Sequence, residues 1–364
     1  MGFRCGIVGL PNVGKSTIFN ALTAAGAEVA NYRFCTIDPN VGVVPVPDMR
    51  LESIAKLIHP KKVIPTTLEF FDIAGLAKGA SHGEGLGNQF LDHIRNLDAI
   101  AHTVRCFTNE NVAHDFGSID PVRDIEVINT ELILADLQTL EKRMARAEKL
   151  YRVGGKEAAL DLEVYREVQA VLNRGERAGT FHPTGERETV FFNLHLLTAK
   201  PVFYVANVDQ KELRGEGTCL KAMTQWLERE GNKVVVICGD LEAELSELKE
   251  EEREEFRKEL GLESSSLERL IQVGYEILGL ITFYTTVSAE LRAWTISRGT
   301  PAPKAAGKIH TDMERGFIRA EVISFSDFIA LGSEHLAREK GLLRSGGKDY
   351  LIQDGDIVHF RFNV

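Results

Sequence analysis

The sequence predicts a doubly wound α/β domain that is interrupted by a helical arm and followed by a smaller, largely β domain. Short β-rich segments alternate with helical stretches in two separate parts of the chain, a pattern typical of a mainly parallel sheet covered by helices. A long helical stretch separates these two parts, and strands with turns dominate the end of the chain. The expected division is 1–124 together with 200–281 for the α/β domain, 125–199 for the arm, and 282–364 for the last domain.

The expected strands are short runs of apolar and β-branched residues. In the α/β domain they cover residues 3–8, 41–46, 66–71, 100–107, 202–206 and 233–238. A helical segment at 16–24 follows the first of them. Strands of the last domain are expected at 292–296, 317–324 and 357–362. Thr300 and Pro301 are the expected N-cap and first residue of a helix in that domain.

Apolar side chains in the arm are spaced by three and four residues. In its first half they are Ile133, Leu137, Leu140, Met144, Ala147 and Tyr151. In its second half they are Ala158, Leu162, Tyr165, Gln169 and Leu172, with Gln169 as a polar interruption. This spacing predicts a coiled-coil seam, and Gly154 with Gly155 predicts an antiparallel hairpin. The alternative is that both seams pack on the main domain.

The charge of the chain is unevenly distributed. With 43 Lys and Arg against 53 Asp and Glu, the formal net charge is −10, which argues against a general nucleic-acid binder because basic side chains contact phosphates. The arm tip, residues 142–156, nevertheless holds six basic residues and one acidic residue. Residues 240–259 hold ten acidic and four basic residues, and we expect them to form a solvated helix face. This distribution is compatible with an RNA-facing arm on an acidic body.

Residues 9–16, GLPNVGKS, match the phosphate-binding pattern G-x-x-x-x-G-K-[ST]. The expected strand before the loop and helix after it are what the motif requires. Backbone N–H groups of such a loop point at the β-phosphate, Lys15 bridges the β- and γ-phosphates, and the Ser16 hydroxyl binds Mg²⁺. The motif therefore predicts a nucleoside triphosphate site with Mg²⁺ as its cofactor.

Two further parts of such a site follow along the chain. Asp72 ends a predicted strand and begins the sequence Asp-Ile-Ala-Gly. Its carboxylate is expected to hold Mg²⁺, usually through water, while the N–H of Gly75 senses the γ-phosphate. Thr36, between the loop and the second strand, is expected to close over Mg²⁺ only when a γ-phosphate is present. The alternative is that Thr36 is an ordinary loop residue.

The segment expected to bind the base departs from a guanine-specific one. Guanine-binding proteins have N-K-x-D here, because a carboxylate accepts from both guanine N1–H and the 2-amino group. This chain has Asn207, Val208, Asp209 and Gln210, and the Gln210 amide cannot accept from both donors at once. Guanine preference is therefore undermined. Asn207 can still pair with the N6/N7 edge of adenine.

The residue that positions the attacking water also differs from the usual one. Ras-type hydrolases have Gln directly after the D-x-x-G glycine, whereas this chain has Leu76. His82 and His114 lie near strand ends and are candidates for the same task. We prefer His114 because the loop 108–117 could fold over the γ-phosphate. The alternative is a surface histidine.

The five cysteines are widely spaced, without a C-x-x-C pair, which argues against disulfides or a zinc site and indicates a reducing compartment. No stretch approaches the roughly 20 apolar residues of a membrane helix, and the N-terminus lacks a secretory signal pattern. We therefore expect a cytoplasmic protein without a membrane partner.

Cys35 directly precedes Thr36. Its oxidation would disturb that threonine, unless Cys35 is an inert small apolar residue.

These motifs resemble the YchF/Obg-like ATPase family over essentially the full length of the chain. The matching segments are residues 6–17, 34–37, 72–76, 83–88 and 353–358. Residues 309–312 and 316–320 resemble the TGS domain of that family, a β-grasp module associated with RNA-linked proteins. The resemblance implies a redox-responsive P-loop protein that hydrolyses ATP in preference to GTP. It also implies binding to the ribosome or ribosomal RNA, for which the arm tip and the TGS domain are the expected contacts.

The resemblance also assigns roles to individual residues. Phosphate binding falls on Asn12, Val13, Gly14, Lys15, Ser16 and Thr17. Mg²⁺ binding falls on Ser16 and Thr36, base contact on Asn207, and catalysis on His114. The chain departs from the family with Gln210 in place of Glu and with Arg33 in place of Pro. A GTP-dependent signalling switch and a non-hydrolysing RNA or ribosome adaptor are the alternative functions.

Overall fold

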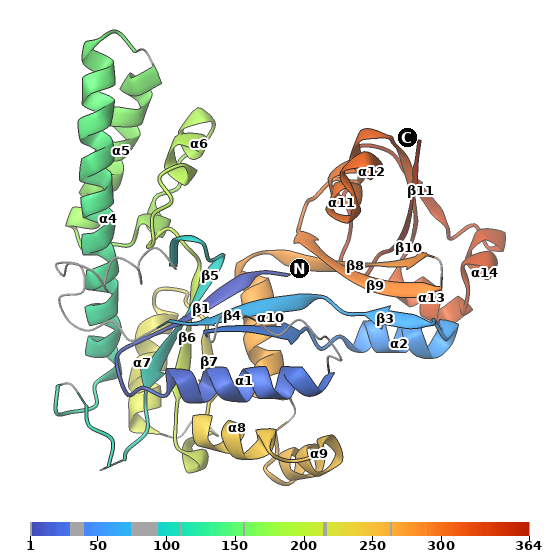
Figure 1. Cartoon of the computed structure of the whole chain (residues 1–364), viewed down its shortest axis with the longest axis horizontal. Coiled ribbons are helices and arrows are strands. Elements are labelled where there is room, and N and C mark those ends of the chain that lie inside the picture. Colours follow the sequence, from blue (N-terminus) through green and yellow to red (C-terminus); the bar gives the residue numbers. More distant parts are fainter. Residues whose placement is uncertain are drawn as a thin grey trace.

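Six strands form the sheet of the α/β domain, in the order β2-β4-β1-β5-β6-β7 (Figure 1). Their bounds are β1 Arg4–Val8, β2 Val41–Pro45, β4 Thr67–Asp72, β5 Ala99–Arg105, β6 Val202–Asn207 and β7 Val234–Ile237. β2 pairs antiparallel with β4, whereas the other neighbours are parallel. The carboxyl ends of the parallel strands therefore meet at one edge, where open α/β sheets bind their ligands.

The computed structural model describes residues 2–29, 40–73, 94–109, 111–114, 116–155, 157–213, 217–262, 264–287 and 289–363. Several residues singled out in the sequence lie outside these ranges, namely Arg33, Cys35, Thr36, Gly75, Leu76, His82 and Lys156. Within the described ranges, no helix is both long enough and apolar enough to cross a membrane.

Helices cover both faces of this sheet. On one face lie α1 (Lys15–Val29) and α10 (Ser266–Ile277), where Ile18 and Leu270 pack on Ile7 and other strand residues. On the other face lie α7 (Thr218–Glu228) and the first part of α4 (Pro121–Arg152). This arrangement confirms the predicted doubly wound domain. The acidic stretch forms α8 (Gly239–Ser246) and α9 (Glu250–Glu259), and the described acidic side chains of α9 are exposed.

The arm is a hairpin of α4 and α5 (Glu157–Asn173) that projects from the α/β domain (Figure 1). The short η2 (Ala178–Thr180) and α6 (Glu186–Phe192) pack against it. Residues from both predicted seams are buried between these elements, but Val168 is buried where the heptad pattern placed Gln169. The polar interruption arises because α5 buries a broader apolar face, directed at both α4 and α6.

A second six-stranded sheet forms the C-terminal part, in the order β11-β10-β12-β8-β9-β3. Its strands are β3 Lys62–Ile64, β8 Leu280–Val287, β9 Glu290–Ser297, β10 Phe317–Ile323, β11 Arg344–Gly346 and β12 Ile357–Phe362. The later helices are α11 Ala302–Ile309, α12 Thr311–Arg315, α13 Phe325–Leu331 and α14 Glu334–Glu339. Helix α11 begins one residue later than predicted, with Pro301 as its N-cap. A β-bridge to Leu351 accompanies the extended conformation of Pro301.

One segment of the N-terminal region lies with the second sheet. Helix α2 (Met49–Ile58) and strand β3 follow β2, and β3 pairs in parallel with β9. Ile54 of α2 is fully buried among C-terminal residues such as Tyr284 and Phe328. The expected division assigned residues 1–124 to the α/β domain, whereas in the structure residues 49–64 pair with and pack on the second sheet. Their β-branched and amphipathic pattern is equally suited to either sheet.

Candidate functional site

The phosphate-binding loop connects β1 to α1 at the carboxyl edge of the first sheet. Two of its residues have left-handed backbone conformations, Asn12 with φ 59° and Gly14 with φ 91°. A Cβ atom on Gly14 would lie 2.2 Å from Asn207 Nδ2. Only glycine satisfies both the backbone conformation and this close approach. The loop is therefore shaped by direct contact with the end of β6.

Lys15 and Ser16 stand at the N-terminus of α1. The Lys15 side chain is 7% exposed, and its Nζ donates to the Leu10 carbonyl at 2.7 Å. The ammonium group is thus held across the loop that would cradle phosphates. Ser16 is exposed at the positive end of the helix dipole. Both residues are placed as the sequence motif predicts.

Asn207 joins three elements of the site. Its Nδ2 donates to the Val13 carbonyl at 3.0 Å, and its Oδ1 accepts from the Gly239 N–H at 2.9 Å. The side chain is 5% exposed, so these bonds link the phosphate loop, β6 and the start of α8. One Nδ2–H remains for a base, because a primary amide has two. The main structural role of Asn207 is therefore to hold the phosphate loop against β6 and α8, and contact with a base is a second, candidate role.

Asp72 provides the test of whether the site suits Mg²⁺. Its Oδ1 is buried, without a hydrogen-bond partner among the described residues. A buried oxygen that lacks a partner is costly unless water or a cation completes it. A carboxylate oxygen here and the Ser16 hydroxyl are the hard ligands that Mg²⁺ prefers. The donor set therefore fits the ion that the motif implies.

A cavity of about 200 Å³ adjoins the phosphate loop. Its lining is Asn12, Gly14, Thr17, Phe107, Asn109, Val112, Asn207, Val208, Asp209 and Asp240. Asn109 and Val112 belong to the loop 108–117, which the sequence analysis placed near the γ-phosphate, whereas Phe107 and Asp240 were not predicted from the sequence. They follow β5 and β7 at the edge of the sheet where β1 and β6 also end, so strand order is the signal that could have found them.

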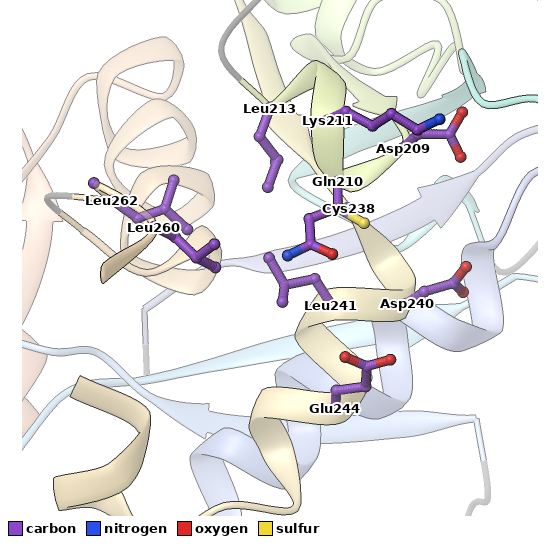
Figure 2. Close-up of a pocket in the computed structure, with 11 residues that line it drawn as sticks. Asp209, Gln210, Lys211, Leu213, Cys238, Asp240, Leu241, Glu244, Leu260 and Leu262 are labelled. Atoms are coloured by element: carbon purple, nitrogen blue, oxygen red, sulfur yellow. The ribbon is translucent and has the colours of Figure 1, made fainter. Parts of the chain in front are cut away.

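A second cavity, of about 1110 Å³, adjoins the first and shares Asp209 and Asp240 with it. Figure 2 shows Gln210 in this second cavity, between Leu213 and Leu241. Gln210 does not line the cavity beside the phosphate loop. Asp209 Oδ2 accepts from the Thr108 N–H at 3.2 Å and from its hydroxyl at 3.3 Å. One carboxylate oxygen is thereby engaged by the loop that follows β5.

That loop is folded back by a single buried guanidinium. Arg105, at the end of β5, donates to the carbonyls of Phe107, Asn109 and Val112 at distances of 3.0 to 3.2 Å. The Asn12 amide donates to the Ala113 carbonyl at 3.4 Å. The loop therefore lies beside the phosphate loop, in the region where the sequence suggested it.

His114 is held by both ring nitrogens. Nε2 lies 2.9 Å from Asp124 Oδ2, and Nδ1 accepts from the Phe116 N–H at 3.2 Å. The side chain is 9% exposed, so His114 is not a freely solvated surface residue. Arg123 donates to the other oxygen of Asp124 at 3.0 Å. This network places the ring hydrogen on Nε2, and the catalytic role of His114 stays a prediction.

On β5 and directly after it, burial keeps two titratable side chains uncharged. His102 on β5 has its pKa lowered to about 3 by burial and by the positive charges of Arg177 and Lys15. Burial also raises the pKa of the Cys106 thiol. Both groups are therefore neutral near pH 7.

A phosphate loop between the first strand and helix of a doubly wound sheet, with Asp72 ending the adjacent strand, defines a P-loop NTPase. Residues 4–143 match a family model described as 50S ribosome-binding GTPase. Residues 280–363 match the model YchF-GTPase_C, described as a protein of unknown function. The chain belongs to the YchF family.

Relatives and solved structures support this membership over the whole chain. The chain is 50% identical over 367 residues to "Ribosome-binding ATPase YchF" of Bacillus subtilis, and 51% identical over 364 residues to the protein of that name in Escherichia coli O157:H7, with 100% of each chain covered. The structure of the Schizosaccharomyces pombe YchF GTPase is similar, with TM-score 0.88, 36% identity, and coverage of 99% of this chain and 98% of that one. A GTP binding protein from Pyrococcus horikoshii shares the fold, with TM-score 0.63 and 21% identity over 99% and 100% of the two chains.

Proposed function

We propose that the chain is a Mg²⁺-dependent nucleoside triphosphate hydrolase that prefers ATP to GTP and acts on the ribosome in the cytoplasm. The proposal rests on the phosphate loop, which Asn207 holds by a hydrogen bond and which encloses Lys15, and on the adjacent Asp72 oxygen, which has no partner among the described residues. Such a site suits a triphosphate with a divalent cation. The names of the relatives motivate ATP and the ribosome as the particular substrate and partner.

The reaction is phosphoryl transfer to water. The water oxygen forms a bond to the γ-phosphorus while the bond to the β–γ bridging oxygen breaks, and the nucleoside diphosphate leaves with that oxygen. Lys15 exchanges its contact with the Leu10 carbonyl for the β- and γ-phosphates. Ser16 and Asp72 would hold Mg²⁺, directly and through water respectively, together with Thr36, and the ion neutralises phosphate charge when bound. Loop N–H groups, including those of Val13 and Gly14, orient the phosphates, and Gly75 contributes at the γ-phosphate.

His114 is the proposed residue that positions the attacking water. With its hydrogen directed to Asp124, its acceptor nitrogen is Nδ1. That nitrogen must exchange the Phe116 N–H for water before it can take a proton. Turnover without a partner is therefore expected to be slow, since the resting contact has to open first.

The proposed preference for adenine follows from the hydrogen-bond acceptors that a bound guanine would lack. The remaining Nδ2–H of Asn207 suits N7, which adenine and guanine share, so it does not discriminate between them. Gln210 lies in the neighbouring cavity, and one oxygen of Asp209 is engaged by Thr108. Neither residue therefore offers the two donors on the guanine edge the bidentate carboxylate that the fourth position of a guanine-specific motif provides.

Two measurements test the proposal. Calorimetric titration with ATP and with GTP, each with Mg²⁺, should give tighter binding of ATP; tighter GTP binding would support a GTP-dependent switch instead. Phosphate release should be detectable alone and should rise when ribosomes are added. Ribosome binding without turnover under either condition would identify a non-hydrolysing adaptor.

A further inference from the structure

A single arginine, Arg105, binds carbonyl groups from both ends of the loop that follows β5. Its side chain is buried, with 3% of the residue exposed. Its nitrogen atoms Nε, Nη2 and Nη1 donate to the carbonyls of Phe107, Asn109 and Val112, and Nη1 also donates to the Ala113 carbonyl at 3.4 Å. Ala113 directly precedes His114. The loop is therefore wrapped around one guanidinium group, up to the residue before the candidate catalytic histidine.

The shape of the arginine side chain explains how it can bond all of these carbonyls at once. A guanidinium group is planar and carries five N–H donors in a fixed fork, whereas a lysine ammonium is a single point on a flexible stem. The Arg105 Cζ atom also lies 4.6 Å from the centroid of the Phe107 ring, which suits a cation–π contact. The backbone of the loop and its Phe107 side chain are thus held by the same group.

The backbone of Arg105 belongs to a fixed part of the first sheet. Arg105 lies opposite Asn207 in the parallel pairing of β5 with β6. The N–H of the next residue, Cys106, donates to the Asn207 carbonyl at 2.8 Å. Asn207 in turn bonds the phosphate loop through the Val13 carbonyl. A shift of the loop relative to Arg105 is therefore also a shift relative to the phosphate loop.

The position and the orientation of the His114 ring depend on separate contacts. The Ala113 carbonyl accepts from Arg105 Nη1 and from the Asn12 amide of the phosphate loop, both at 3.4 Å. These bonds determine where the backbone of His114 lies. The ring is instead oriented by its contact with Asp124. Arg105 therefore contributes to the position of the ring rather than to its orientation.

We infer that Arg105 is a positioning residue for hydrolysis, which holds the backbone before His114 so that the ring lies beside the phosphate loop. The inference rests on the proposed function, because it requires that His114 positions the attacking water. Arg105 is not itself a catalytic residue, since its side chain is buried and directs its N–H groups at the carbonyls of the loop. Displacement of a catalytic group by about 1 Å can cost about a hundredfold in rate. A loosened loop should therefore lower kcat.

The test compares two variants that each replace a buried arginine by lysine. Arg105→Lys keeps the charge, but a single nitrogen atom cannot bond carbonyls at both ends of the loop. The control is Arg253→Lys in α9, where Arg253 is also 3% exposed and donates to the carbonyls of Leu245 and Leu248 at 2.9 and 2.8 Å. Arg253 lines neither of the two cavities near the phosphate loop. We expect kcat of Arg105→Lys to fall by about tenfold to a hundredfold, and kcat of the control to stay unchanged.

A double variant shows whether Arg105 acts through His114. In the His114→Ala background, Arg105→Lys should cause no further fall in kcat, because the residue that Arg105 positions is absent. A further fall of similar size, or an unchanged kcat in the single variant, would overturn the inference. Tripolyphosphate, a probe without a base, should bind equally to the unmodified chain and to Arg105→Lys in calorimetry. Weaker binding to Arg105→Lys would mean that the phosphate loop itself has moved, which also overturns the inference.

A measurement that needs no turnover separates failure of the inference from failure of the proposed function. The NMR signal of the His114 ring is identified by its absence from His114→Ala. We expect this signal to shift in Arg105→Lys and to keep its position in Arg253→Lys; an unchanged signal in Arg105→Lys would overturn the inference. If the unmodified chain releases no phosphate from ATP, the proposed hydrolysis is wrong, while the ring signal still decides whether Arg105 holds His114. If Arg105→Lys does not fold, Arg105→Gln, whose neutral amide is less costly to bury, gives the same comparison.

Discussion

His114 Nε2 lies 2.9 Å from Asp124 Oδ2, and Asp124 belongs to the first turn of the long arm helix α4. The Asp124 carboxylate is 2% exposed and also accepts from Arg123. The candidate catalytic histidine and the arm therefore share a buried hydrogen bond. This contact fixes which ring nitrogen carries the hydrogen and so which one is able to accept a proton.

Replacing Asp124 should slow hydrolysis without weakening nucleotide binding. In Asp124→Asn the amide no longer specifies the ring tautomer, and we expect kcat to fall about tenfold with KM for ATP unchanged. This loss is smaller than the roughly 10²- to 10⁴-fold that general acid–base catalysis contributes, because the histidine itself remains. His114→Ala should fall by about a hundredfold. The double variant should match His114→Ala alone, because the two residues act as a unit. Full activity of His114→Ala would show that the histidine is structural.

Asn207 should affect ATP and GTP equally. In Asn207→Ala the Val13 carbonyl and the Gly239 N–H lose their partner, which costs about 1–3 kcal/mol for such buried groups. We expect both nucleotides to bind roughly tenfold to a hundredfold more weakly, an energy that corresponds to the same range. Calorimetry with each nucleotide measures this. Weakening for ATP alone would mean that Asn207 selects the base rather than bracing the loop.

His102 should make the fold sensitive to mild acid. Its pKa is lowered to about 3 in the folded chain, against about 6.5 when unfolded, so stability is fully present above pH 6.5 and lost as pH falls toward 3. The free energy of unfolding should drop by about 2 kcal/mol between pH 7.5 and 5 from this group. Urea unfolding of the unmodified chain and of His102→Gln at both pH values gives the comparison. An equal drop in both proteins would exclude His102 as the cause.

Ile54 should stabilise the C-terminal sheet although it lies near the N-terminus. Ile54→Ala leaves a cavity among Tyr284, Leu291 and Phe328, at a cost of about 2–5 kcal/mol. Hydrogen exchange should therefore accelerate in β8 and β9. The control Leu270→Ala, in the core of the first sheet, should accelerate exchange in β1 and β5. The reverse pattern would contradict the placement of α2.

Cys35 should account for any fast-reacting thiol. Burial raises the pKa of Cys5, Cys106, Cys219 and Cys238, so the reactive thiolate is scarce at each. Labelling of the native chain with iodoacetamide should therefore modify Cys35 first, and Cys35→Ser should remove the fast phase and the sensitivity of hydrolysis to peroxide. Identical labelling and peroxide sensitivity in both proteins would refute a redox role for Cys35.

Local sequence was sufficient for the parts whose signal is local. The phosphate loop, the strands around it and the arm hairpin each depend on spacing within a few residues, and all three are confirmed. The predicted N-cap of α11 was Thr300, whereas the structure has Pro301 in that role. Pro301 is extended and forms a β-bridge with Leu351, a residue distant in the sequence that local patterns do not reveal. Gln169 was predicted to lie in the seam, but Val168 is buried there instead, since α5 packs on both α4 and α6.

The lining of the site was less predictable than its loop. Phe107 and Asp240 reach the cavity only because β5 and β7 end at the same edge as β1, which depends on strand order. The engagement of Asn207 with Val13 and Gly239 likewise joins positions far apart in the chain. The residue type of Asn207 indicated a base contact, but it did not reveal the hydrogen bonds that hold the phosphate loop.

Helix α4 runs without interruption for 32 residues from Pro121 to Arg152, a length of about 48 Å. One end contacts His114 through Asp124, and the other end is the basic tip. A rod of this length turns a tilt of about 5° at its root into a displacement of about 4 Å at its far end. The basic tip and the hydrogen bond that holds His114 therefore lie at opposite ends of one continuous helix.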